Sequence, residues 1–262
     1  MQINIQKKKL VVFDLDGTLV ESKSAMDAEM SALFTDLLKK KIVAVIGGGK
    51  YELFKSQLIE RLSTSQELRK RLFLFPTTAT SFYRYKSGWK KVYALNLSTA
   101  QAAKIKNTFN KVFKEVGYWH PKKTYGEIIE NRGTQVSFSV YGQDVVAVLG
   151  KQGVEMKKEW KRRFNSTKIK IAKLLQKYLP EFEIRAAGFT TVDVTRKGID
   201  KAYGIEQIEA HLDVPKAQMV FVGDALFPGG NDYAVRRTGV QCIPVKGPED
   251  TKKLIRSWLA DL

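Results

Sequence analysis

The chain has 262 residues, 44% of them hydrophobic, and a formal net charge of +18 at pH 7. This length and hydrophobic content predict an ordinary soluble globular protein with a sizeable core. No apolar run approaches the roughly 18 residues of a membrane span, and the lysines at Lys7 to Lys9 lead into a run that holds Asp14 and Asp16, unlike a signal peptide. The single cysteine, Cys242, excludes an internal disulfide and a cysteine-based zinc site. We therefore expect a cytoplasmic protein with no membrane partner.

The basic charge needs its own explanation. A basic surface serves nucleic acids, anionic membranes or phosphorylated small molecules, so the charge alone does not choose among them. The lysines are spread over most of the predicted helices and do not form one basic tail. This distribution favours a solvated lysine-rich surface over a dedicated nucleic-acid face, although a nucleic-acid partner stays open.

The first quarter of the chain alternates between strand and helix patterns. Residues 10–13 form a short apolar run that ends at Asp-Leu-Asp-Gly-Thr, which is typical of a strand buried on both faces. An amphipathic helix pattern follows over 30–37, a second buried strand over 42–46 and a second helix over 51–62. Such alternation predicts a parallel sheet covered by helices.

The pattern changes after Pro76 and returns at Gly198. The middle part predicts a hairpin over 82–85 and 91–95, a helix over 105–116, a second hairpin over 135–141 and 145–149, and a long basic helix over 157–178. The last part predicts a helix over 200–211, a strand over 219–222, a helix after 232, a strand over 240–244 and a final helix from 248. The sheet thus starts, stops and resumes, which predicts a core made of residues 1–81 and 189–262 with an inserted α+β domain over 82–188.

Three carboxylates follow predicted strands of the core. Asp14 and Asp16 follow the first strand, and Asp224 follows the strand over 219–222. Ligands of open α/β sheets bind beyond the carboxyl ends of the strands, so these side chains can converge there. Such a cluster suits Mg²⁺, and a metal-shielded phosphate can be attacked by an aspartate. In the same loop, Gly17 and Thr18 can bring backbone N–H groups to a phosphate.

These motifs resemble, in order and spacing, the signature set of the haloacid dehalogenase superfamily. The motifs are Asp14–Thr18, Lys201 at a helix start, and Val222–Asp232 after a late strand. The resemblance implies a Rossmann-like core in which Asp14 attacks phosphorus, Asp16 protonates the leaving group and Lys201 neutralises the phosphoryl charge. It also implies a Mg²⁺ site formed by Asp14, Asp16, Asp224, Asn231 and Asp232.

The position of the insertion matches the cap of subfamily IIB, also called the C2 type, in that superfamily. Within it the chain is similar to the eukaryotic-type phosphomannomutases over nearly its full length. The similar segments are Gly47–Glu52, Tyr85–Gly88, Ser139–Gly142, Val192–Lys201 and Pro228–Asp232. This resemblance implies a phosphorylated sugar or a similar small phosphate ester as substrate, and pairing into a homodimer through the cap.

Three positions depart from the mutase pattern. Gln143 stands where the family has a cap arginine, and Lys23, a point charge without a bidentate fork, stands where it has another arginine. The second motif of the superfamily is a Ser or Thr, whereas Gly47, Gly48 and Gly49 offer only backbone N–H groups. Loss of an anchor for a second phosphate penalises a bisphosphate intermediate more than simple hydrolysis.

The resemblance implies further substrate contacts from the cap. Arg132 lies one residue from the position of a cap arginine, and Thr191 and Asp193 match positions that contact sugar hydroxyls. Alternation along a strand would put Thr191 and Asp193 on one face. A polar strand face in water explains the same pattern equally well.

These observations favour a sugar-phosphate phosphatase. The alternative is a phosphomannomutase that interconverts mannose 1-phosphate and mannose 6-phosphate. A remote third reading, motivated by the charge of +18, is a nucleic-acid-binding protein on this scaffold.

Overall fold

The computed structural model describes residues 3–262, which form two compact units. The core unit comprises the described residues up to Ala94 together with Asp200–Leu262, and the insert unit comprises Leu95–Ile199. The insert was predicted over residues 82–188. In the structure, residues 82–94 belong to the core unit and residues 189–199 belong to the insert unit. None of the helices in residues 3–262 has the length and apolar character needed to cross a bilayer.

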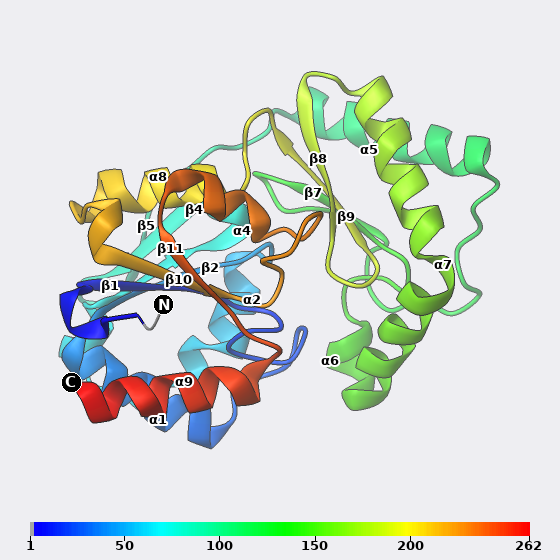
Figure 1. Cartoon of the computed structure of the whole chain (residues 1–262). Coiled ribbons are helices and arrows are strands. Elements are labelled where there is room, and N and C mark those ends of the chain that lie inside the picture. The colour runs from blue at the N-terminus through cyan, green and yellow to red at the C-terminus, as the bar shows by residue number, and fades with distance from the viewer. Residues whose placement is uncertain (1–2) are drawn as a thin grey trace. The chain divides into compact units, whose positions relative to one another are not determined.

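The core unit contains a seven-stranded sheet in the order β11-β10-β1-β2-β3-β4-β5 (Figure 1). Its strands are β1 (Leu10–Asp14), β2 (Ile42–Ile46), β3 (Leu72–Phe75), β4 (Ser81–Tyr85), β5 (Trp89–Ala94), β10 (Met219–Gly223) and β11 (Gln241–Pro244). Its helices are α1 (Ala28–Lys40), α2 (Tyr51–Gln57), α3 (Gln66–Arg69), α4 (Pro76–Ala79), α8 (Lys201–Leu212) and α9 (Pro248–Asp261). The 3₁₀ helices are η1 (Ile5–Lys7), η2 (Ile59–Arg61), η3 (Lys216–Gln218) and η4 (Tyr233–Thr238). The strands from β11 to β3 pair in parallel, whereas β4 pairs antiparallel with both β3 and β5.

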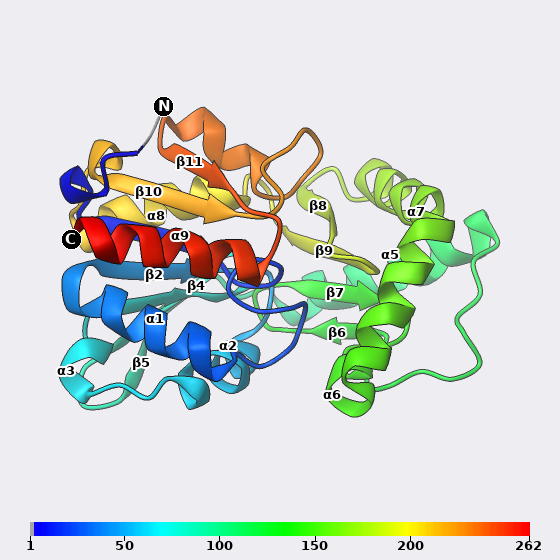
Figure 2. The same ribbon diagram turned by 60° about the horizontal axis from the view of Figure 1, so that its bottom comes forward.

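Both faces of the parallel strands are covered, which explains their continuous apolar sequences. Along β1, Val11 and Phe13 join the core beneath α1 and α9, whereas Leu10 and Val12 join the core beneath α8. Figure 2 shows α1 and α9 side by side on one face of the sheet. A buried strand needs apolar residues at every position, as predicted.

The insert unit contains a four-stranded antiparallel sheet in the order β6-β7-β9-β8. Its elements are α5 (Thr99–Val116), β6 (Ile129–Asn131), β7 (Val136–Ser139), α6 (Val145–Leu149), α7 (Lys151–Tyr178), β8 (Phe182–Ala187) and β9 (Thr191–Arg196). One face of this sheet packs on α5 and α7: Phe138, Val192 and Val194 meet Phe109 and Ile171 there. The predicted fold class, an α/β core with an inserted α+β unit, is confirmed.

Three predicted elements are wrong in kind or in place. The hairpin β4–β5 extends the core sheet, because β4 pairs with β3, and does not belong to the insert. Residues 145–149 form α6 and not a strand, a known ambiguity of short apolar runs. The helix expected after Asp232 is the short 3₁₀ helix η4.

Candidate active site

Two neighbouring strands of the core sheet carry carboxylates at their carboxyl ends. Asp14 is the last residue of β1, Asp224 directly follows β10, and the two strands pair in parallel. Carboxyl ends of parallel strands share one edge of a sheet. Oxygens of Asp14, Asp224 and Asp232 lie within 4.8 Å of one another at that edge. Three of the acidic side chains named from the sequence are therefore together.

Lys201 places a cation inside this cluster. It is the first residue of α8, and its N-cap Asp200 accepts hydrogen bonds from two backbone N–H groups of the first turn. The Lys201 side chain is 2% exposed and forms ion pairs with the carboxylates of Asp14 and Asp232. The N-cap Asp200 thus fixes where α8 begins and where the side chain of its first residue lies.

Burial and mutual repulsion govern ionisation in the cluster. Burial raises the pKa of Asp14 well above its usual range despite the nearby ammonium of Lys201, and the charges of Asp232 and Asp224 add to this rise. Burial and Asp232 raise the pKa of Asp224 to about 6. Burial disfavours the charge on Lys201, yet the carboxylates of Asp14 and Asp232 raise its pKa and keep it protonated.

The cluster has the chemistry of a divalent cation site. Three carboxyl groups lie around one ammonium in a largely buried space, so the cluster carries an excess of negative charge when all three are ionised. Gly17 lies directly against this space, because a Cβ there would stand 2.6 Å from Asp224 Oδ2, and its φ of +88° also favours glycine. An oxygen-rich, anionic pocket of this kind fits Mg²⁺.

Mg²⁺ should therefore stabilise the protein in a pH-dependent way. Because the pKa of Asp224 is raised in the fold, the metal-free folded protein binds more protons than the unfolded chain between about pH 4 and 6. The free energy of unfolding should therefore fall as the pH rises through that window. Mg²⁺ should raise the melting temperature at about pH 7.5 and lose this effect below about pH 6, where Asp224 is protonated. Scanning calorimetry across pH checks this, with Asp224→Asn as the variant that should not respond. A shift of equal size at pH 5 would contradict the metal site.

Asp232 and Asn231 lie in the loop after β10 but differ in surroundings. Asp232 is fully buried, with Oδ1 paired to Lys201 and Oδ2 accepting from the Ala225 N–H at 3.0 Å. Both oxygens are therefore engaged in orienting Lys201 and the loop. Asn231 is exposed. The two residues expected to support the metal are thus not equivalent, because Asp232 is buried and ion-paired with Lys201 whereas Asn231 is exposed.

Asp16 does not belong to the group of three clustered carboxylates, and its side chain has other partners. Its Oδ1 accepts hydrogen bonds from the Lys23 N–H at 2.5 Å and from the Gln57 amide at 3.1 Å. Lys23 contributes its backbone here, in a left-handed conformation with φ of 56°. Gln57, on α2, was not predicted from the sequence. Its signal was a polar residue between Phe54 and Leu58 on the buried side of the helix.

The loop after β1 is closed by its own backbone. The Gly17 N–H donates to Val20 O at 2.7 Å, so it does not point freely at a phosphate. Thr18 is fully buried, and its hydroxyl donates to Asp14 Oδ2 at 3.4 Å and accepts from the Asp224 N–H at 3.1 Å. Thr18 thus links the two strand ends that carry the carboxylates.

The glycines after β2 are bound by a left-handed turn. The Gly47 N–H donates to Phe75 O at 3.3 Å, while the carbonyls of Gly47 and Gly49 accept from Thr78 and Thr77 at 2.8 Å. Thr77, Thr78 and Ala79 of the segment labelled α4 all have positive φ, from 50° to 62°, so this segment is a left-handed turn and not an α-helix. Hydrogen bonds within the fold therefore engage part of the backbone of the segment from Gly47 through Gly48 to Gly49. The turn that holds this segment was not predicted.

Two residues expected to bind substrate contact each other in the insert unit. The Arg132 side chain is 4% exposed, and its Nε pairs with Glu130 at 2.8 Å. Its Nη2 donates to Gln143 Oε1 at 2.8 Å, and the Gln143 amide donates to Ser137 O at 3.1 Å. The guanidinium is thus held by a carboxylate and an amide of its own unit.

Thr191 and Asp193 lie on the polar face of the insert sheet, as alternation predicted. Val192 and Val194 point into the core on the other face. Asp193 is 3% exposed and accepts from the Ser137 hydroxyl at 2.6 Å. This face is therefore a buried hydrogen-bonded surface and not a strand face in open water.

Comparisons with known proteins show similarity over nearly the whole chain. Over 97% of both chains the protein is 25% identical to a probable phosphomannomutase of Caenorhabditis elegans. A phosphomannomutase of Encephalitozoon cuniculi is 25% identical over 95% of this chain and 93% of its own. Among solved structures, Plasmodium falciparum IMP-nucleotidase superposes with a TM-score of 0.68 at 15% identity, covering 97% of this chain and 68% of that one. A trehalose-6-phosphate phosphatase related protein gives a TM-score of 0.52 at 15% identity, covering 96% and 97%.

The structural likenesses show the fold, and the sequence match shows the family. The family model of haloacid dehalogenase-like hydrolases matches residues 11–234, a span that begins in β1 and reaches the loop carrying Asp224 and Asp232. It therefore includes every carboxylate of the cluster and Lys201. The chain belongs to the haloacid dehalogenase-like hydrolase family.

Proposed function

We propose that this protein is a Mg²⁺-dependent phosphatase that acts on a phosphorylated sugar or a similar small phosphate ester through a phosphorylated Asp14. The observation that carries the proposal is the buried Asp14 carboxylate, ion-paired to Lys201 beside Asp224 and Asp232. A carboxylate in such a place is oriented for attack on phosphorus, and the ammonium can balance the phosphoryl charge. When bound by Asp14 and Asp224, Mg²⁺ supplies further neutralisation of the phosphate oxygens.

The side chains divide the reaction into two transfers. Asp14 attacks phosphorus and forms an acyl phosphate, while protonated Asp16 gives its proton to the departing sugar oxygen. Asp16, now a carboxylate, takes a proton from water, which attacks the same phosphorus and releases inorganic phosphate and free Asp14. The bonds from Lys23 and Gln57 to Asp16 Oδ1 fix this carboxylate and leave Oδ2 for the proton.

The contacts of Arg132 in the insert unit favour water over a sugar as the acceptor of the phosphoryl group. A mutase must hold a second phosphate, and the resemblance assigned that task to cap arginines. Arg132 is instead paired with Glu130 and Gln143. In the proposal, Thr191 and Asp193 contact hydroxyls of the substrate and no strong anchor holds a second phosphate.

A phosphomannomutase is the second candidate, favoured by similarity to phosphomannomutases over nearly the full chain. Incubation of mannose 1-phosphate with Mg²⁺ and a sugar bisphosphate separates the two functions. A phosphatase releases inorganic phosphate, whereas a mutase produces mannose 6-phosphate. Isomerisation that exceeds hydrolysis would reject the phosphatase.

Gln143→Arg should shift the balance toward isomerisation. It adds a guanidinium beside Arg132, and one charge-assisted hydrogen bond to a second phosphate corresponds to about tenfold in the ratio of isomerisation to hydrolysis. Both products are measured from mannose 1-phosphate. Gln143→Met is the matched control, because it removes the same amide bonds without adding charge. An unchanged ratio in Gln143→Arg would remove the main argument against the mutase.

A further inference from the structure

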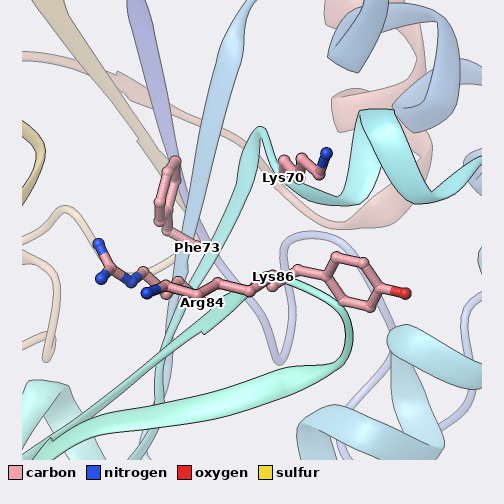
Figure 3. Close-up of a pocket in the computed structure, with 5 residues that line it drawn as sticks. Lys70, Phe73, Arg84 and Lys86 are labelled. Carbon is pink, nitrogen blue, oxygen red and sulfur yellow. The ribbon is translucent and has the colours of Figure 1, made fainter.

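A pocket opens on the core unit, away from the carboxylate cluster. It has a volume of about 460 Å³ and is lined by Lys70, Phe73, Arg84, Tyr85 and Lys86 (Figure 3). The pocket lies where the parallel strand β3 begins and the antiparallel strand β4 ends. The carboxylates follow the opposite, carboxyl ends of the parallel strands. The pocket and the cluster thus occupy opposite edges of one sheet.

Strand pairing places cations directly opposite one another beside this pocket. Phe73 on β3 pairs with Arg84 on β4, and Arg84 pairs with Lys90 on β5. Residues opposite each other in neighbouring strands share a face, and like charges in such pairs are destabilising. The row from Phe73 through Arg84 to Lys90 therefore combines one aromatic ring with two mutually repelling cations.

Within the described part of the chain, no carboxylate forms an ion pair with either cation of this row. Among residues 3–262, Arg84, Lys86 and Lys90 make no ion pair, and all three are exposed. Lys70 alone has a partner, Glu67, at 2.6 Å. The charges of Arg84, Lys86 and Lys90 thus have no ion-pair partner among the described residues, and an anion that bound here would reduce their mutual repulsion.

The lining restricts what that anion is. Phe73 is half-buried in the pocket wall and offers a ring against which a planar group can stack, as Figure 3 shows it standing beside the Arg84 side chain. Arg84 can hold a phosphate with two parallel hydrogen bonds, and Lys86 adds a point charge. The volume is within the range of small-molecule sites. We propose that this pocket binds a nucleoside phosphate, with the base against Phe73 and the phosphate between Arg84, Lys86 and Lys90.

Titration of the full chain with AMP, without divalent cations, tests the proposal by calorimetry. AMP should bind wild type and the exposed-lysine control Lys40→Gln alike, and Arg84→Gln or Lys86→Gln should weaken it at least about tenfold. Adenosine and inorganic phosphate should each bind at least about tenfold more weakly than AMP. Equal AMP affinity in Arg84→Gln and wild type would overturn the proposal. An oligoribonucleotide that bound more tightly than AMP through the same residues would overturn it in favour of a nucleic-acid surface.

Lys90→Glu separates a ligand site from a merely structural patch. It places a carboxylate opposite Arg84, so the melting temperature should rise while AMP affinity falls at least about tenfold. Retained AMP affinity in this variant would reject the site. Hydrolysis of p-nitrophenyl phosphate should be the same in Lys90→Glu, Arg84→Gln and wild type, so failure here leaves the proposed phosphatase untouched.

Discussion

Asp14→Asn should lower hydrolysis of p-nitrophenyl phosphate with Mg²⁺ by at least about 10³-fold, because an amide cannot form the acyl phosphate. The fold should survive, since Lys201 keeps its ion pair with Asp232. Steady-state phosphate release measures the first effect, and circular dichroism with thermal melting measures the second.

The matched control for this variant is Asp36→Asn. Asp36 is a half-exposed aspartate of α1, and its one ion pair among the described residues is with Lys39 in the same helix. The same chemical change at Asp36 should leave the rate within about twofold of wild type. Wild-type turnover in Asp14→Asn would show that another group receives the phosphoryl group.

Lys201→Met should destabilise the protein and abolish most of its activity. Loss of the ammonium leaves the buried Asp14 and Asp232, beside the half-buried Asp224, without a compensating charge, which should cost about 3–5 kcal/mol in the free energy of unfolding. Urea unfolding without divalent cations at about pH 7.5 measures this loss.

The pH dependence distinguishes charge from packing. Because burial raises the pKa of Asp14 and brings that of Asp224 to about 6, acid should neutralise the carboxylates and shrink the loss in Lys201→Met at about pH 5. Adding Asp232→Asn should restore part of the stability but not the activity. A loss that is equal at both pH values would mean that Lys201 acts through packing alone.

The parallel core could be predicted because its signals are local. β1, β2 and β10 are short apolar runs, and a strand buried on both faces has no other sequence pattern. Asp14 and Asp224 could be placed together for the same reason, since both follow such strands. Lys201 followed from motif order, and its N-cap Asp200 marked the start of α8.

Non-local features could not be predicted in this way. The hairpin β4–β5 was foreseen, but nothing in its residues shows that it pairs with β3. The left-handed turn at Thr77, Thr78 and Ala79 contains no glycine, the usual marker of positive φ. It persists because tertiary bonds to the glycine loop after β2 hold it.

Side-chain partnerships were the hardest part of the site to foresee. Arg132 and Gln143 were considered separately as substrate contacts, whereas the fold brings them into one hydrogen-bonded pair. Asp16 was grouped with the metal ligands, whereas Lys23 and Gln57 hold its carboxylate by hydrogen bonds. Such hydrogen-bonded partnerships join residues that are distant in sequence, and the spacing of motifs along the chain does not predict them.

In the proposed reaction, the phosphoryl group passes from the substrate to Asp14 and then to water. Acid-quenched mass spectrometry of the protein mixed with p-nitrophenyl phosphate and Mg²⁺ tests it most directly, with Asp16→Asn included to slow breakdown of the intermediate. One phosphoryl group should appear on the peptide that contains Asp14 and then decay to inorganic phosphate. A phosphoryl group on any other residue, or steady phosphate release with Asp14 never modified, would rule out transfer through Asp14.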